Sequence, residues 1–149
     1  MANGLELHNY VGHLIRRAEQ VHTGLWFRHV SRDITSQQFA ALNALRQEPG
    51  IDQRTLAHHT SLDRSTINQM VRRLTDQGHV SQARDEDDRR RTLLCLTDEG
   101  AELLDSLIPA AKRINEQLLE SLPENERGLA TGILRKIASM DDAPLGDTG

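Results

Sequence analysis

Apolar residues recur at helical spacing through the first third of the chain. From Leu5 to Leu25 they repeat at about 3.6 residues, which is typical of one face of an amphipathic helix. A second helix is predicted within residues 31–50, with Ser36 as its N-cap and Pro49-Gly50 as its end. The first stripe comprises Leu7, Val11, Leu14, Ala18, Val21 and Leu25, and the second comprises Phe39, Leu42 and Leu45.

Two short helices are predicted next, separated by a tight turn. Asp52 can cap the first helix, which runs to about His59, and Asp63 can cap the second. Residues 60–62 form the turn, and Gly78 ends the second helix. Its inward face is predicted to contain Ile67, either Met70 or Val71, and Leu74.

After His79 the pattern changes from helical to strand-like. Residues 80–83 and 92–96 are predicted strands, joined by a highly charged loop. Thr97 then caps a long helix, in which Pro109 is expected to introduce a kink, and Pro123 opens the last helix. The inward positions of these two helices are Leu103, Leu104, Leu107, Ile108, Ala111, Ile114, Leu118 and Leu119, then Leu129, Ile133, Leu134 and Ile137.

This order of elements predicts a mainly α protein with a small two-stranded β wing. A helix-turn-helix followed at once by a charged hairpin is the outline of a winged helix-turn-helix domain, whose second helix enters the DNA major groove. The terminal helices have no partner within so small a domain and are free to form a dimer. The predicted parts are residues 1–33 and 98–140 for dimerisation, 34–97 for DNA binding, and 141–149 as a disordered tail.

Composition narrows the class of protein. The net charge of -4 argues against a nucleic-acid partner if it is taken alone, but every basic residue except Lys112 and Lys136 is arginine. Arginine makes forked contacts to phosphate and guanine. The chain has no apolar run long enough for a membrane span, no secretory signal and only one cysteine, so we expect a cytoplasmic protein without a disulfide.

Three segments together carry a family resemblance: "LRQEPGIDQRTLA", "LDRSTINQMVRRLTDQGHV", and "DRR" followed by "LLCLTDEG". From Ile34 to about Leu104 the chain resembles the MarR family of bacterial transcriptional regulators. The resemblance implies a homodimeric repressor that binds a pseudo-palindromic operator and is released by a small aromatic effector. Two-fold symmetry would separate the half-sites by about 10 base pairs. A fainter similarity to repressors of nicotinate catabolism points to a hydroxylated pyridine carboxylate.

The polar side of the second short helix is the predicted reading surface. Asn and Gln can bridge two groups on adenine, and Arg can do the same on guanine. The preceding helix begins with residues whose N–H groups favour a phosphate. The predicted DNA contacts are Gln53, Arg54, Thr55, Arg64, Ser65, Thr66, Asn68, Gln69, Arg72 and Arg73. The alternative is a solvated polar helix face.

The charged loop has a role in the family resemblance, which implies that Asp88 braces Arg90 at the wing tip. A braced guanidinium keeps its outer edge free for the negative potential of a narrow minor groove. Arg84, Arg89 and Arg91 are predicted phosphate contacts. Residues 85–87 are expected to be a solvated turn, and a divalent metal site there is the alternative.

A ligand pocket is predicted from residues of the first helix and the loop after it. A tryptophan can stack on an aromatic ring, and an arginine can hold a carboxylate. The candidates are His13, Arg16, His22, Trp26 and His29. The alternatives are that the histidines are surface or interface groups, or that several of them bind zinc. No cofactor is expected.

Two other classes of function compete with a DNA-binding regulator. A winged-helix module that only associates with proteins would tolerate the loss of Arg90. An enzyme is disfavoured, because the sequence lacks a nucleophile–base arrangement, a phosphate-binding glycine loop and metalloenzyme spacing.

Overall fold

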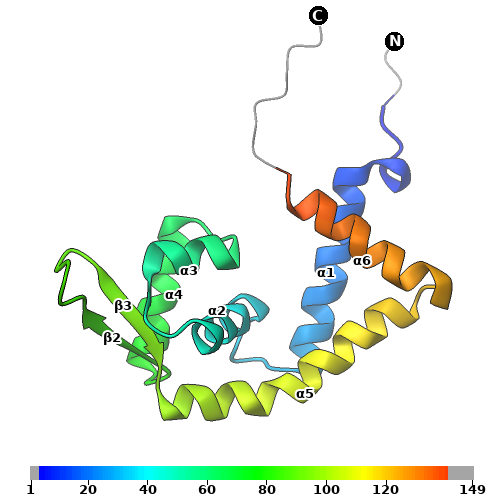
Figure 1. The fold of residues 1–149 in the computed structure, drawn as a ribbon. Coiled ribbons are helices and arrows are strands. Elements are labelled where there is room, and N and C mark those ends of the chain that lie inside the picture. The colour runs from blue at the N-terminus through cyan, green and yellow to red at the C-terminus, as the bar shows by residue number, and fades with distance from the viewer. Residues whose placement is uncertain (1–3, 141–149) are drawn as a thin grey trace, which may run out of the picture. The chain divides into compact units, whose positions relative to one another are not determined.

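A computed structural model describes residues 4–140, so the predicted tail at 141–149 lies outside the described part. The chain divides into two compact units, Met1–Ile114 and Asn115–Gly149. The elements, in chain order, are a 3-10 helix Leu7–Asn9, α1 Val11–His29, α2 Ser36–Gln47, β1 Ile51–Asp52, α3 Gln53–Thr60, α4 Arg64–Asp76, β2 Val80–Arg84, β3 Thr92–Leu96, α5 Asp98–Glu120 and α6 Glu124–Ala138 (Figure 1).

The predicted β hairpin is present, but the sheet has a third strand. Its order is β1-β3-β2, and both pairs are antiparallel. Ile51 pairs with Leu94 and Asp52 with Leu93. The residues just before α3 therefore lie beside the central strand β3, on the side opposite β2. The sequence did not indicate β1 because two residues are too few to show a strand period.

The core of the first unit lies between the helix-turn-helix, the sheet and the start of α5. The sequence predicted that either Met70 or Val71 faces inward on α4. Both are buried, so the inward face of this helix is wider than predicted. The largest fully buried side chains of this core are Leu42, Leu45, Leu56, Ile67, Val71, Leu74, Leu94 and Leu104. These aliphatic side chains hold α2, α3 and α4 against β3 and α5, which fixes the platform from which α4 and the hairpin project.

Most predicted helix caps are confirmed, with one correction. Asp52, Asp63 and Thr97 accept hydrogen bonds from the backbone N–H groups of Thr55, Thr66 and Gly100. Ser36, however, is the first residue of α2, and Thr35 is its N-cap. The Thr35 hydroxyl accepts from the Gln38 backbone, and the Gln38 side chain accepts from the Thr35 N–H, which completes a capping box.

The first helix differs from its predicted range. A 3-10 turn ends at extended Tyr10, and α1 begins only at Val11 but continues to His29, beyond the predicted end at Leu25. Its last turns are fixed by Trp26, which is buried. The Trp26 indole Nε1 donates to the Ile34 carbonyl at 2.6 Å, and its ring lies 5.1 Å from that of Phe39.

Two helices leave much of their apolar surface uncovered. On α1, Val11, Leu14, Ile15 and Val21 are exposed. On α6, the whole predicted apolar face is exposed, with Leu129 at 64% and Leu134 at 60%. None of the helices formed by residues 4–140 combines the length and the apolar character needed to cross a membrane.

Candidate nucleic-acid interface

Helix α4 separates its side chains into a buried side and an exposed side. Ile67, Met70, Val71 and Leu74 are buried. The predicted reading residues Arg64, Ser65, Asn68, Gln69, Arg72 and Arg73 are all exposed. Thr66 is half-buried, and its hydroxyl donates to Asp63 Oδ2 at 2.8 Å, so this side chain belongs mainly to the helix cap. The apolar packing therefore turns a row of polar and cationic groups toward solvent.

An open cavity of about 710 Å³ lies between α3, α4 and the wing. It is lined by four arginines, Arg54, Arg64, Arg90 and Arg91, against a single acid, Asp52. Gln53 and Asn68 line it as well. The cavity is therefore cationic although the whole chain carries a net charge of -4, and it brings together predicted contacts from three separate segments.

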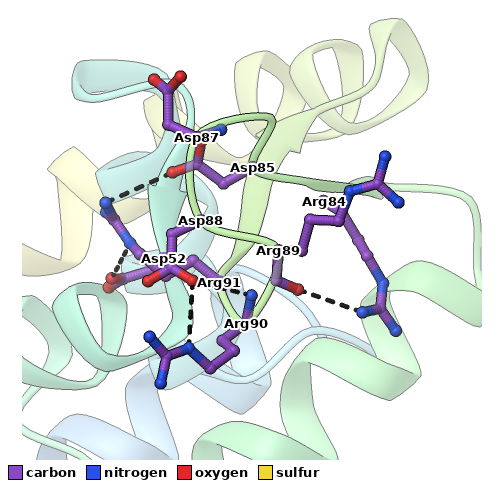
Figure 2. A network of polar contacts seen from close by, with 8 residues as sticks. All are labelled: Asp52, Arg84, Asp85, Asp87, Asp88, Arg89, Arg90 and Arg91. Carbon is purple, nitrogen blue, oxygen red and sulfur yellow. Dashed lines mark hydrogen bonds and ion pairs between the residues drawn. The ribbon is translucent and has the colours of Figure 1, made fainter.

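The wing tip has the braced arginine that the family resemblance implies. Asp88 Oδ1 accepts from the backbone N–H of Arg90 at 3.1 Å and pairs with Arg90 Nε at 3.4 Å (Figure 2). The Arg90 side chain is nevertheless 94% exposed. The contact through Nε restrains the side chain, while most of the guanidinium stays exposed to solvent.

The other wing arginines do not behave alike. Arg84 Nη1 donates to the Arg89 carbonyl at 3.1 Å, so it links the two sides of the loop, and both Arg84 and Arg89 are exposed. Arg91, also predicted as a phosphate contact, pairs with Asp52 at 3.1 Å and with Asp85 at 3.4 Å. The expectation that Asp85 is only part of a solvated turn is therefore wrong, because its carboxylate is 15% exposed and holds Arg91.

The N-caps of α3 and α4 are carboxylates whose charge is stabilised by hydrogen bonds. The side chain and backbone N–H of Thr55 hold the pKa of Asp52 below its usual value, and Arg91 lowers it further. The backbone N–H and hydroxyl of Thr66 do the same for the pKa of Asp63. Both charged caps lie at helix N-termini, where the helix dipole favours a negative charge.

The lowered pKa of Asp63 predicts a loss of stability in acid. Because the folded state favours the charged carboxylate, its contribution is complete above the ordinary value of 3.8 and disappears as pH falls through the lower folded-state value. Asp63→Asn keeps a good N-cap without the charge. We expect the stability difference between wild type and this variant, measured by urea unfolding, to shrink below about pH 4.

The control for this measurement is Asp87→Asn, which removes a carboxylate of the wing turn that caps no helix. The difference in stability between this variant and wild type should change less over the same pH range. A difference for Asp63→Asn that stays constant down to about pH 2.5 would contradict the assigned role of the charged cap.

The predicted ligand-binding residues are only partly brought together. His22 and Trp26 are neighbours, with ring centroids 6.4 Å apart. Trp26 is buried against Phe39 with its N–H satisfied, so its indole forms part of the core. His13 is half-buried, whereas Arg16 and His29 are exposed. The 710 Å³ cavity lies elsewhere, beside the wing.

The helix-turn-helix, the hairpin beside it and the cationic cavity between them define a winged helix-turn-helix protein of the DNA-binding class. The sequence model of the MarR family matches residues 32–91. The chain is also 38% identical over 133 residues to the HTH-type transcriptional repressor NicR of Pseudomonas putida, covering 89% of this chain and 84% of that protein. The chain belongs to the MarR family of transcriptional regulators, and its class is therefore that of regulators rather than enzymes.

Solved structures agree with this assignment. The PcaV transcriptional regulator of Streptomyces coelicolor, in complex with its natural ligand, is 42% identical with a TM-score of 0.88, over 92% of this chain and 97% of that one. BpsR of Bordetella bronchiseptica, whose DNA binding is regulated by 6-hydroxynicotinic acid, is 28% identical with a TM-score of 0.88, over 93% and 100%. The similarity therefore extends well beyond residues 32–91, which the family model matches.

Proposed function

We propose that this regulator is a homodimeric repressor that acts in the cytoplasm. It binds a pseudo-palindromic operator and releases it when a small aromatic or pyridine carboxylic acid binds. The observation that carries the proposal is the cationic cavity shared by α3, α4 and the wing. It places base-reading and phosphate-binding side chains on one surface, as a protein that grips a duplex needs.

The contacts divide by chemistry. Arg64, Ser65, Asn68 and Gln69 are exposed on α4 and would reach base edges in the major groove, with Arg72 and Arg73 beside them. Gln53, Arg54 and Thr55 form the first turn of α3, where the Thr55 N–H is capped by Asp52 and the side chains of Gln53 and Arg54 would reach a phosphate. Arg90, braced by Asp88, would enter the neighbouring minor groove, and Arg84 and Arg89 would lie near its phosphates.

Dimerisation is supported by the uncovered apolar surfaces of α1 and α6. Several large apolar side chains on each helix are about half exposed or more, such as Val11 at 59% and Ile133 at 48%. Burial against a second copy would remove this surface from water. A two-fold dimer would present one α4 to each of two major grooves, about 34 Å apart along the duplex.

An acidic effector is supported by the relatives and by the chemistry of α1. BpsR responds to 6-hydroxynicotinic acid, a pyridine carboxylate. In this chain Arg16 could hold a carboxylate, and the half-buried His13 and His22 could hydrogen-bond ring substituents. Trp26 would contribute from the core by backing His22, and exposed His29 would lie at the edge. We propose His13, Arg16, His22 and His29 as the effector contacts, with Trp26 as the residue that supports His22.

The test is an electrophoretic mobility shift on the DNA upstream of the protein's own gene, at several stated salt concentrations. We expect a specific shift whose log affinity falls steeply with log salt, since several phosphate contacts displace counterions. A panel of benzoates, hydroxybenzoates and pyridine carboxylates should include a compound that abolishes the shift.

Three outcomes would contradict separate parts of the proposal. No shift on any upstream fragment would favour a winged-helix module for protein association. A shift that every acid of the panel leaves unchanged would remove the proposed effector class. A monomer in sedimentation at the concentrations that shift DNA would contradict the two-fold operator.

A further inference from the structure

We infer that Arg91 is a positioning residue, which ties the wing to the N-terminus of α3 so that Arg90 and α4 are set at a fixed separation before DNA binds. This inference rests on the proposed DNA binding and adds to it a residue that makes no DNA contact. Arg91 follows Arg90 directly in the sequence, but its side chain has a different set of partners.

The guanidinium of Arg91 joins two carboxylates from different elements. Its Nε lies 3.1 Å from Oδ2 of Asp52, the N-cap of α3, and its Nη1 lies 3.4 Å from Oδ2 of Asp85 in the wing (Figure 2). Asp52 Oδ1 is occupied as well, because it accepts the Thr55 N–H at 2.8 Å. A single arginine therefore connects the cap of α3 to the first residue after β2.

Neighbouring arginines of the wing show how unusual this arrangement is. The Arg90 side chain is 94% exposed and pairs with Asp88, whereas that of Arg91 is 49% exposed. The two acids that hold Arg91 are much less exposed, at 21% for Asp52 and 15% for Asp85. Partly desolvated charges interact more strongly than fully exposed ones, so this pairing restrains the wing more than a surface ion pair would.

Backbone hydrogen bonds place Arg91 at the junction between the wing tip and its base. The Arg91 carbonyl accepts from Asp85 N at 3.0 Å, and the Arg91 N–H donates to the Asp88 carbonyl at 2.9 Å, which closes the tip. At the base, β1 pairs with β3 at Ile51 and Asp52, and the Gly50 N–H donates to the Leu94 carbonyl at 2.9 Å. The Arg91 side chain extends the attachment beyond this short ladder, toward the tip that carries Arg90.

A wing that is already held in its DNA-binding position improves affinity, because it loses less conformational entropy when DNA binds. When only a fraction of the free molecules has the competent wing, the apparent dissociation constant rises by the inverse of that fraction. If loss of Arg91 reduces the competent fraction to roughly a tenth, affinity falls about tenfold. The loss would not remove a phosphate contact.

The test compares Arg91→Met with Arg89→Met, which removes the same charge from an exposed neighbour that we expect to contact phosphate. Both affinities are measured on the same operator over a series of salt concentrations. Arg91→Met should weaken binding about tenfold at each salt, with the slope of log affinity against log salt unchanged. Arg89→Met should flatten this slope by about 1. A flattened slope for Arg91→Met would make it a phosphate contact and overturn the inference.

Double variants separate positioning from a general loss of structure. Asp52→Asn keeps the cap of α3 and loses the charge that holds Arg91, so adding Arg91→Met to it should weaken binding little further. Arg91→Met should also have little effect in an Arg90→Ala background, because the group that it positions is absent. Additive losses in both pairs would overturn the inference.

A measurement without DNA keeps this inference distinct from the proposed function. In the free protein, Arg91→Met should accelerate hydrogen exchange of the Asp85 amide by about tenfold, whereas Arg89→Met should not. If exchange of the Asp85 amide were unchanged in Arg91→Met, the proposed attachment of the wing to α3 through Arg91 would be wrong. If wild type failed to shift DNA but this exchange still increased, the proposed function would fail while the attachment of the wing to α3 would stand.

Discussion

Arg90→Ala is expected to weaken operator binding by about 1–3 kcal/mol while the protein remains folded. The side chain is 94% exposed and pairs with the wing residue Asp88, so its removal leaves no cavity in the core. On DNA, the same side chain would lie in the narrow groove, where negative potential is strongest. The loss should therefore appear in the affinity and not in the free energy of unfolding.

Titration of wild type and variant at one salt concentration measures this effect, with urea unfolding as the check on stability. Arg90→Lys is the matched control, because it keeps the charge but loses the planar guanidinium. Its operator affinity should lie between those of wild type and Arg90→Ala. Unchanged affinity in Arg90→Ala would show that the wing tip is not a DNA contact.

Gly100→Ala is expected to destabilise the fold by about 1–3 kcal/mol. A Cβ at this position would overlap the carbonyl oxygen of His79, which accepts the Thr97 N–H at 3.1 Å. Thr97 also donates through its hydroxyl to the Gly78 carbonyl at 2.6 Å. The first turn of α5 is thus packed directly on the backbone of the α4–β2 turn, and an added methyl group would force the two apart.

Thermal or urea unfolding measures this loss, with Glu102→Ala as the control two residues further along α5. Glu102 is exposed, so that variant should stay within about 0.5 kcal/mol of wild type. Equal stability of Gly100→Ala and wild type would mean that α5 can shift away from the turn without loss.

Much of the fold could be predicted because the sequence marks its elements locally. The inward face of α4 and the caps Asp52 and Asp63 follow from periodicity and helix-terminus chemistry, which depend on neighbours in the chain. The two-residue strand β1 could not be predicted in this way, because its partner lies more than 40 residues away and its length shows no period. Thr35 was missed because Ser36 beside it is an equally good capping residue type.

Features of the site that follow from residue type and local spacing could be predicted from the sequence. Features that depend on partners distant in the sequence could not. The exposed row on α4 and the contact of Asp88 with Arg90 were both anticipated. Arg91 was not separated from its neighbours, since three successive arginines look alike until the fold brings Asp52 beside one of them. Trp26 was expected at a ligand, but its distance from Ile34 and Phe39 in the sequence concealed its place in the core.

The buried indole also gives the protein an intrinsic optical probe. Trp26 is the only tryptophan in the chain, and it links the last turns of α1 to the start of α2 through Ile34 and Phe39. The emission spectrum of Trp26 therefore reports on the junction between α1 and α2. Arg16 and His22 lie on the same helix as Trp26. If the proposed carboxylic acid binds beside this junction, steady-state fluorescence of Trp26 will follow its titration without any label.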